Sequence, residues 1–190
     1  MRLLEEMILR KGKVLPGGIL KVGDFLNQQI DTDLLREMAK EIARLFADCG
    51  VTKILTIESS GIAIAVAAGM EMNVPVVFAK KNRSSNVDGD VYSTVVHFYT
   101  HNSDYTVVVG SDYLKPGDNV LLVDDFLANG KALLGLTDLV KQAGASLAGA
   151  AIQIEKGFQG GGDTLRARGV RVESLATVER MTDTEIIFRS

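Results

Sequence analysis

The hydrophobic positions of the chain follow two patterns that take turns along the sequence. Short apolar runs occur at 53–57, 74–78, 120–123 and 147–154. Such runs are typical of strands that are buried on both faces of a parallel sheet. Helical patterns lie before and between them, at 34–46, 61–72 and 133–141. Strands that alternate with helices form βαβ units, so the sequence predicts an α/β fold with a parallel sheet flanked by helices.

Shorter elements are predicted at both ends of the chain. A short amphipathic helix that ends at Gly12 is indicated by the spacing of Leu3, Leu4, Met7 and Ile8. The turn signal 16–18 precedes a segment of mixed polarity at 19–27, which we expect to be a loop with a short strand. Near the C-terminus the pattern predicts a flexible glycine-rich turn at 157–163, a short helix near 164–168, and strands at 170–175 and 185–188.

A long projecting hairpin is predicted in the middle of the chain. Its first strand is an alternating segment at 91–98, and the second is a run at 105–109. The segment before it, 79–90, changes to basic and small polar residues, which alone indicates a solvated loop. His97 and His101 have no acid or cysteine at ligand spacing, so we expect both to be bystanders rather than metal ligands.

Composition narrows the class of protein. A chain of 190 residues that is 46% hydrophobic can bury one substantial core, which favours a single domain. Its net charge of −3 gives no overall basic field, so no nucleic-acid partner is expected. No apolar run approaches the roughly 18 residues of a membrane span and no signal-peptide core is present, so we expect a cytoplasmic protein without a membrane partner. Cys49 is the one cysteine, which excludes an intramolecular disulfide and a thiolate zinc site.

The most informative chemistry follows the apolar run at 120–123. Asp124 and Asp125 come at the carboxyl end of this predicted strand, the edge where open α/β sheets bind ligands. The small-residue loop 128–132 then leads into a helix, where backbone N–H groups and the helix dipole suit a phosphate. An ordinary strand-to-helix turn with a solvated acid pair is the alternative. Lys131 argues against it, because a cation in the first turn of a helix is unfavourable unless an anion is near.

This stretch resembles the phosphoribosyl pyrophosphate (PRPP) signature of the type I phosphoribosyltransferases: a hydrophobic strand, Asp-Asp, two further residues, Ala and a small-residue loop. Asn129 stands where that family usually has Thr, Lys131 where it has Gly, and Ala132 where it has Thr. The variant Ala-Asn-Gly-Lys-Ala is similar to the loop of the bacterial xanthine phosphoribosyltransferases. The resemblance runs nearly end to end, from the segment 20–27 to Glu155-Lys-Gly-Phe158.

The resemblance implies a type I phosphoribosyltransferase fold in one domain, 1–190. It implies a small hood, formed by about 1–30 and 156–190, and a mobile lid hairpin at about 80–110. Asp124 and Asp125 would be the catalytic pair that holds the ribose 2′- and 3′-hydroxyls. The 5′-phosphate would be held by Ala128, Asn129, Gly130, Lys131 and Ala132.

The same resemblance assigns residues to the pyrophosphate and to the base. Ser59, Ser60 and Lys81 are candidates for the pyrophosphate, although a serine that only caps the next helix is an equally simple interpretation of Ser59 or Ser60. The candidates for xanthine are Leu20, Asn27 and Lys156. The residues alone would not single out Leu20 or Asn27, and Lys156 could be an exposed lysine at a strand end.

The implied reaction moves ribose 5-phosphate from PRPP to xanthine, in purine salvage, with magnesium as cofactor and no residue assigned to the metal. A homodimer is expected. Two alternatives stay open: an enzyme for another purine (guanine, hypoxanthine or adenine), and a non-catalytic regulator that senses PRPP. Such regulators carry a DNA-binding domain ahead of the fold, whereas only a few tens of residues precede the first βαβ unit here, and they are not notably basic.

Overall fold

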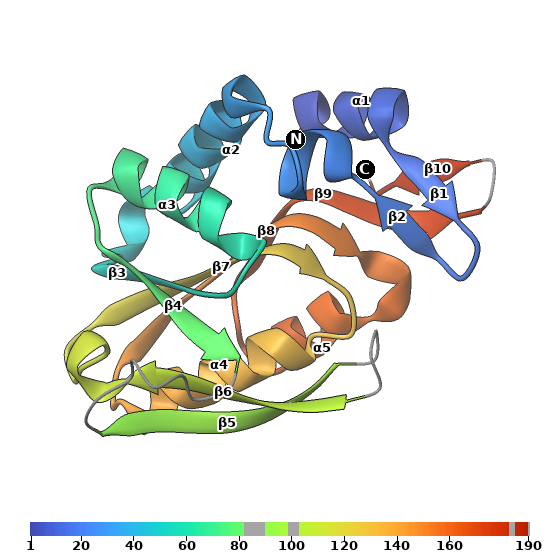
Figure 1. The fold of residues 1–190 in the computed structure, drawn as a ribbon. Coiled ribbons are helices and arrows are strands. Elements are labelled where there is room, and N and C mark those ends of the chain that lie inside the picture. The colour runs from blue at the N-terminus through green and yellow to red at the C-terminus, as the bar shows by residue number, and fades with distance from the viewer. Residues whose placement is uncertain (82–89, 99–102, 183–184, 190) are drawn as a thin grey trace.

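The computed structural model describes residues 1–81, 90–98, 103–182 and 185–189. Eight strands of this described part form one sheet, in the order β10-β9-β8-β7-β3-β4-β6-β5 (Figure 1). Their bounds are β3 (Lys53–Ile57), β4 (Val76–Lys81), β5 (Val91–Phe98), β6 (Ser103–Gly110), β7 (Asn119–Leu127), β8 (Ser146–Lys156), β9 (Val172–Met181) and β10 (Ile186–Phe188). The five central strands, β9, β8, β7, β3 and β4, pair in parallel. The outer strands join them through antiparallel pairs, β10 with β9 at one edge and β6 with β4 at the other. The predicted parallel sheet is confirmed for the centre of the molecule.

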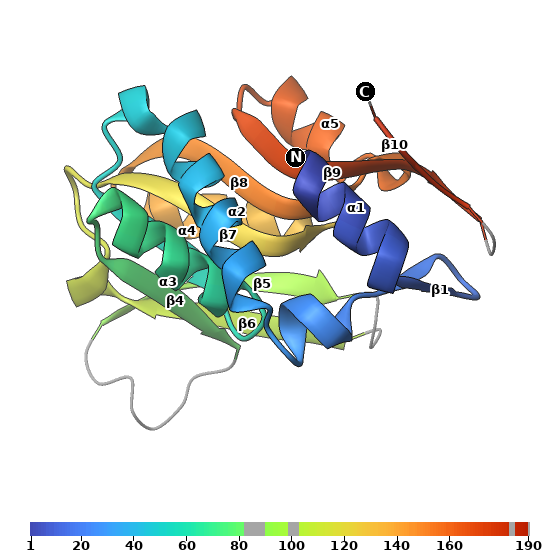
Figure 2. The same ribbon diagram turned by 90° about the horizontal axis from the view of Figure 1, so that it is seen from above.

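Helices cover both faces of this sheet. They are α1 (Arg2–Lys11), α2 (Thr32–Leu45), α3 (Gly61–Met72), α4 (Lys131–Gln142) and α5 (Gly161–Ala167). Successive side chains of a strand point to opposite faces, and so Leu121 packs in the core beneath α1, α2 and α3 while Leu122 packs in the core with α4 and α5. Seen from above, α2 and α3 lie in front of the sheet (Figure 2). The flanking helices are therefore confirmed.

Capping and periodicity predict the helices well. α3 and β3 have the predicted limits. The N-cap of α2 is Asp31, whose carboxylate accepts a hydrogen bond from Leu34 N at 3.1 Å. The helix ends at Leu45, and a 3-10 turn then runs to Gly50, which has the left-handed conformation at φ 61°.

Strand limits are predicted less well, because polar residues beyond an apolar run also pair with the neighbouring strand. β7 extends past 120–123 on both sides, since β8 pairs with it as far as Leu127. β4 starts two residues later than predicted and continues to Lys81, because Lys80 and Lys81 pair with Val108 and Val107 of β6. Lys81 thus lies at a strand end rather than in a loop.

The predicted hairpin exists, but its described part does not project from the molecule. β5 and β6 pair along their whole length, and β6 joins the sheet edge through β4. Val96, Val107 and Val109 are buried in the core that also contains α4, and Gln142 of α4 donates a hydrogen bond to Ser93 O at 2.9 Å. The rest of the proposed lid, 82–89 and 99–102, lies outside the described residues, as does His101.

The glycine-rich segment at 157–163 is not the flexible turn that was predicted. It forms a 3-10 turn (Gly157–Gln159) and the first residues of α5, which begins at Gly161 rather than near Thr164. Gly161 and Gly162 are buried. Because these glycines have no side chains, their backbone packs directly on neighbouring groups, and glycine here serves close packing rather than flexibility.

The N-terminal segment lies over the carboxyl ends of the central strands. α1 is followed by a small hairpin, β1 (Lys13–Leu15) and β2 (Ile19–Lys21), and by a short π-helical turn (Gly23–Asn27) where a loop was predicted. The N-terminal ammonium group donates a hydrogen bond to Leu175 O on β9. α1 and β10 therefore lie at the same end of the molecule (Figure 1). None of the described helices is long and apolar enough to cross a membrane.

Candidate functional site

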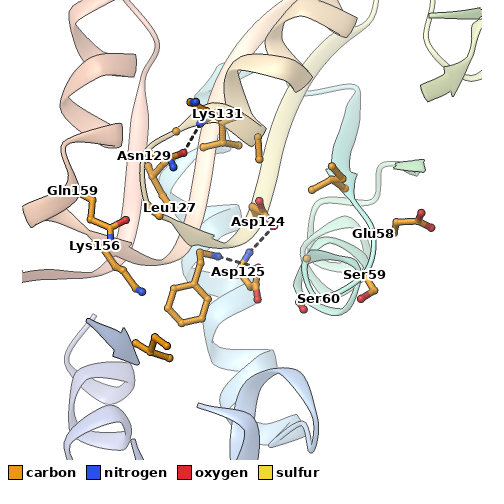
Figure 3. Close-up of a pocket in the computed structure, with 18 of the residues that line it drawn as sticks. Glu58, Ser59, Ser60, Asp124, Asp125, Leu127, Asn129, Lys131, Lys156 and Gln159 are labelled. Carbon is orange, nitrogen blue, oxygen red and sulfur yellow. Dashed lines mark hydrogen bonds between the residues drawn. The ribbon is translucent and has the colours of Figure 1, made fainter. Parts of the chain in front are cut away.

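A cavity of about 640 Å³ opens at the carboxyl edge of the sheet. It is lined by residues from distant parts of the chain, namely 17–19, 57–61, 81, 124–133, 156 and 159. The acid pair lies in the middle, with Ser59 and Ser60 on one side and Lys156 on the other (Figure 3). Its size suits a small-molecule substrate.

Strand pairing explains why the acid pair faces open space. β7 pairs with β3 at 120–122 but continues along β8 to Leu127, so the last part of β7 has a neighbouring strand on one side. Asp124 and Asp125 occupy this extension. Asp124 and Asp125 lie within β7 rather than at its end, where they were predicted. They still lie at the carboxyl edge of the sheet, because β7 pairs with β3 only at 120–122.

The two carboxylates are held close to the backbone. Asp124 Oδ1 accepts a hydrogen bond from Asp125 N at 3.0 Å, and Asp125 Oδ1 accepts one from Phe126 N at 3.0 Å. Burial, reinforced by the neighbouring Asp125 charge, raises the pKa of Asp124 well above its usual range. Burial also raises the pKa of Asp125, and hydrogen bonds from its surroundings, including the Asn27 side chain, offset part of this. In the free protein the pair therefore tends to retain a proton.

Asp124 packs tightly against the start of α3. A Cβ atom on Gly61 would lie 2.7 Å from Asp124 Oδ1 and 2.4 Å from Thr56 Oγ1, so only glycine fits there. Thr56 is fully buried, and its hydroxyl is the one buried side-chain polar atom of the described residues without a hydrogen-bond partner. The floor beneath the acid pair is thus fixed by main-chain contact rather than by flexible side chains.

The loop 128–132 has the shape of an anion cradle. Gly130 adopts φ 82°, which favours glycine, and caps α4. The Asn129 side chain accepts a hydrogen bond from Lys131 N at 3.1 Å, a local turn that orients the loop. Lys131 is the first residue of α4, and all five residues line the cavity. Backbone N–H groups at the start of a helix of this length attract an anion.

Ser59 and Ser60 line the opposite wall. Ser60 is the residue before α3, but its hydroxyl makes no capping hydrogen bond. A simple serine cap is therefore not what the structure shows for Ser60. Glu58, which the sequence did not single out, accepts a hydrogen bond from Lys81 N at 2.6 Å. Lys81 also lines the cavity, and its positive charge acts to lower the pKa of Asp124.

Lys156 reaches into the cavity from the end of β8. Its ammonium donates a hydrogen bond to Gly18 O at 3.0 Å and lies 5.7 Å from the centre of the Phe126 ring. Burial lowers the pKa of Lys156. The interpretation of Lys156 as an exposed strand-end lysine is wrong, since the side chain is partly buried between the N-terminal hairpin and β7.

Two predicted residues do not line the cavity. The Leu20 side chain is 6% exposed and packs in the core beneath α1, whereas its neighbour Ile19 is 52% exposed and faces the cavity. Strand alternation in β2 explains this exchange. Asn27 is exposed in the π-helical turn and hydrogen-bonds to Asp125 rather than lining the cavity.

Several lining residues had no sequence signal of their own. Phe126 and Leu127 were only the two residues between the acid pair and Ala128 in the signature, and Gln159 lay within the predicted flexible turn. Gln159 lies beside Lys156 (Figure 3). Its spacing of three residues from Lys156, within a tight turn, would have been the available signal.

The donor set suits a hard divalent cation that arrives with its substrate. The described residues contain no group of three or more His, Cys, Asp or Glu that could enclose a metal. Magnesium usually takes one or two carboxylates together with waters and substrate phosphates, and two carboxylates beside a phosphate cradle fit that pattern.

Comparisons with known proteins agree with this geometry. The model of the phosphoribosyl transferase domain family matches residues 21–181. The chain is 54% identical over 192 residues to a xanthine phosphoribosyltransferase of Bifidobacterium longum, with 100% of both chains covered. It is 51% identical over 191 residues to one of Lachnoclostridium phytofermentans, covering 100% of this chain and 98% of the relative.

Solved structures show the same fold at low sequence identity. An adenine phosphoribosyltransferase (APRTase) of Giardia lamblia, in complex with 9-deazaadenine, superposes with a TM-score of 0.80 at 23% identity, covering 93% of this chain and 98% of that one. The adenine phosphoribosyltransferase of Rhodothermus marinus gives 0.76 at 22% identity, covering 94% and 100%. These likenesses establish the fold, whereas the sequence relatives bear on the substrate.

Proposed function

The chain belongs to the phosphoribosyltransferase family, and from this premise we propose that it transfers ribose 5-phosphate from PRPP to xanthine. The products are xanthosine monophosphate and pyrophosphate, a reaction of purine salvage. The observation that carries the proposal is the identity of about half of all residues, over the whole chain, with proteins named xanthine phosphoribosyltransferase. The arrangement of charges around the cavity supports it.

The three parts of PRPP match three walls of the cavity. The 5′-phosphate would lie in the loop 128–132, where main-chain N–H groups and the start of α4 attract an anion. The ribose hydroxyls would donate hydrogen bonds to Asp124 and Asp125. The pyrophosphate would lie by Ser59 and Ser60, on the far side of the acid pair from Lys156 (Figure 3), with Lys81 as a further lining residue.

The acid pair would also act on the charge that develops during transfer. A bond forms between a ring nitrogen of the base and the anomeric carbon, the bond from that carbon to pyrophosphate breaks, and the nitrogen gives up its proton to the departing pyrophosphate. The sugar carries positive charge on the way. Two fixed carboxylates beside the ribose stabilise that charge without rearrangement, so catalysis rests on positioning and electrostatics.

Lys156 would select the base. Its ammonium can donate hydrogen bonds to the exocyclic oxygens of xanthine, and its hydrogen bond to Gly18 O directs it into the cavity. The Phe126 ring provides an apolar surface beside it. Because Leu20 faces the core, we assign the contact of the N-terminal hairpin with the base to the backbone at 17–19 and to Ile19, with Asn27 acting beside Asp125.

Magnesium is the proposed cofactor. When it is bound with PRPP it neutralises phosphate charge and so favours departure of pyrophosphate. Asp124 and Asp125 are the described residues that could face it. Lys81 and the two serines, which line the same cavity, would hold the leaving group by hydrogen bonds and charge.

A homodimer in the cytoplasm is the remaining part of the proposal. Val66 and Met70 of α3 expose apolar side chains, at 44% and 78% of their surface, and line one shallow hollow. Phe78 of β4 is 43% exposed. A second copy is the simplest cover for exposed apolar side chains of this kind. Sedimentation at micromolar concentration would show twice the chain mass, and a monomer there would contradict the assignment.

One assay tests the function. The protein is incubated with magnesium, PRPP and a panel of xanthine, guanine, hypoxanthine and adenine, and nucleotide and pyrophosphate are measured. Xanthine should give the highest kcat/KM. A preference for another base would reassign the substrate within the family, whereas PRPP binding without any product would favour a regulator that senses PRPP.

The Asp125→Asn variant provides the matched test of the site. It should lose roughly ten- to a hundredfold in kcat/KM, because a charge-assisted hydrogen bond to the ribose is replaced by a neutral one. Folding should be preserved, since the residue is only partly buried at a strand end. Turnover at the level of the unmodified protein would contradict the role given to the acid pair.

A further inference from the structure

An ion pair with a buried carboxylate connects the phosphate loop with the strand that carries Lys156. Glu155 precedes Lys156 on β8 and is 1% exposed. Arg166 of α5 donates to both carboxylate oxygens, at 2.9 and 2.8 Å, and Ser174 Oγ donates to Oε2 at 2.5 Å. Arg166 also donates to Val172 O at 3.2 Å. The pair therefore fixes α5 to two neighbouring strands, β8 and β9.

The first turn of α5 lies directly against the phosphate loop. Gly161 N donates a hydrogen bond to Ala128 O at 3.1 Å. A Cβ atom on Gly161 would lie 2.3 Å from Ala128 O and 2.5 Å from Gly130 N, so the two backbones touch with no side chain between them. Gly161 O in turn lies 3.2 Å from where a Cβ on Gly130 would be. A displacement of α5 would therefore displace the loop.

The ion pair sets the position of that turn. A Cβ atom on Gly162 would lie 1.9 Å from Glu155 Oε1 and 2.6 Å from Arg166 Nη1, which means that the helix backbone rests on the carboxylate itself. Two consecutive glycines thus contact the loop on one side and the ion pair on the other. Glu155 is therefore connected to Ala128 through its ion pair with Arg166 and the backbone of Gly162 and Gly161.

Stability alone is a poor explanation for this pair. The Glu155 carboxylate is buried while the Arg166 side chain is 35% exposed. Burying a charged group costs much of what its attraction to a partner returns, and apolar replacements are often as stable. Burial acts to raise the pKa of Glu155, but hydrogen bonds from Arg166 and Ser174 outweigh it and hold the pKa below its usual value. The carboxylate is therefore charged at neutral pH and keeps a fixed, two-pronged geometry with the guanidinium.

From this geometry we propose that Glu155, Arg166 and Ser174 are positioning residues that set the affinity of the loop 128–132 for the 5′-phosphate. The inference rests on the proposed function for the identity of the ligand. Neither Glu155 nor Arg166 lines the cavity, so they act through α5 and not by touching the phosphate. Sequence reasoning missed them because their contacts with the loop pass through two glycines.

The test compares Glu155→Gln with a matched control. Asp118→Asn breaks another partly buried ion pair, Lys53–Asp118, whose charged atoms lie 2.7 Å apart and whose side chains are 15% and 18% exposed. This pair lies at the amino ends of β3 and β7, away from the cavity. The Kd of ribose 5-phosphate, which carries the 5′-phosphate without pyrophosphate, is measured by calorimetry for each full-length variant. Glu155→Gln should raise this Kd roughly ten- to a hundredfold, as expected when a binding group is misplaced. Asp118→Asn should lower the Tm and leave the Kd unchanged.

An unchanged Kd in a folded Glu155→Gln protein would overturn the proposal and leave the pair a merely structural one. If that variant does not fold, Ser174→Ala decides. It removes one donor and keeps the ion pair, and it should raise the Kd about threefold, the worth of one hydrogen bond. No change there would equally overturn the proposal. In the assay, KM for PRPP should rise more than KM for xanthine. Binding of ribose 5-phosphate by the unmodified protein without turnover would refute the proposed function alone.

Discussion

The acid pair is a poor feature for stability and a good one for binding. Two adjacent carboxylates are partly or wholly buried at the end of β7, and burial raises the pKa of both Asp124 and Asp125. Ionising them costs free energy in the folded protein, and a ligand that brings hydroxyl donors and cations would recover it. Such strain is typical of a functional site.

Replacing Asp124 by Asn should therefore stabilise the protein while it impairs transfer. The folded pKa is raised, so the proton held by Asp124 stabilises the fold fully below about pH 4, where unfolded aspartate is also protonated. This stabilisation is lost as pH rises through the folded pKa. An asparagine has no such loss, so the free energy of unfolding of Asp124→Asn should exceed that of the unmodified protein at pH 8.

Urea unfolding at pH 4 and pH 8 measures this difference. The free energies of unfolding of the two proteins should converge at the lower pH. Asp118→Asn should instead be less stable than the unmodified protein at pH 8, because hydrogen bonds from Lys53 and Lys115 outweigh burial and lower the pKa of Asp118. A variant of Asp124 that is less stable at pH 8 would show that the carboxylate supports the fold instead.

Lys156→Ala should reduce the preference for xanthine over hypoxanthine. The ammonium is a charged donor to the exocyclic oxygens of xanthine, so its loss should lower kcat/KM for xanthine roughly ten- to a hundredfold, the worth of a hydrogen bond to a charged group. Hypoxanthine has one of those oxygens and should lose less. Steady-state kinetics with both bases give the ratio. Equal losses would mean that Lys156 positions the N-terminal hairpin through Gly18 O and does not read the base.

At the scale of elements, limits that depend on local sequence patterns are predicted better than limits that depend on pairing between strands. The limits of α3 and β3 follow from an alanine-rich pattern and a bounded apolar run, and both match the structure. β7 and β8 are longer than their apolar runs, because hydrogen bonds between strands do not depend on side-chain polarity. α5 begins among glycines, which have poor helix propensity, because tertiary contacts override it.

The start of α4 is the element for which the sequence makes the sharpest prediction. Lys131 is its first residue, so Lys131→Glu would place a negative charge against the 5′-phosphate and should raise KM for PRPP roughly tenfold or more. Lys141→Glu in the last turn of the same helix is the control. It reverses the same charge at the far end, opposes the helix dipole there and should affect stability but not KM. Equal KM values in both variants would count against the phosphate cradle.

At the scale of the whole molecule, the site depends on contacts that no local pattern reveals. Lys156 and Gly18 are 138 residues apart and meet through a hydrogen bond. The sequence located the acid pair, the loop 128–132 and Lys156, each at the carboxyl edge of a predicted strand. It did not show that the Leu20 side chain faces the core and Ile19 the cavity, because this depends on which face of a two-stranded hairpin turns to the core. Long-range packing decides such choices, and the amino-acid pattern of a short strand does not.

Substrate binding should couple to the protonation of the whole site. The free protein favours a protonated acid pair because burial raises both pKa values. Ribose hydroxyls and magnesium favour the ionised pair, so binding of the magnesium complex of PRPP should release protons. Its affinity should therefore increase as pH rises through the pKa of the free pair.

Ligand binding to the folded state alone raises stability by about 2.7 kcal/mol at a hundredfold excess over Kd. For a chain of this size that is a Tm increase of roughly 5–10 °C. The shift should be larger at pH 8 than at pH 6, and calorimetry in buffers of different ionisation enthalpy should report the released protons. Asp124→Asn should bind more weakly and release fewer protons. A Tm shift that is equal at both pH values, together with no proton release, would show that PRPP leaves the charge of the acid pair unchanged.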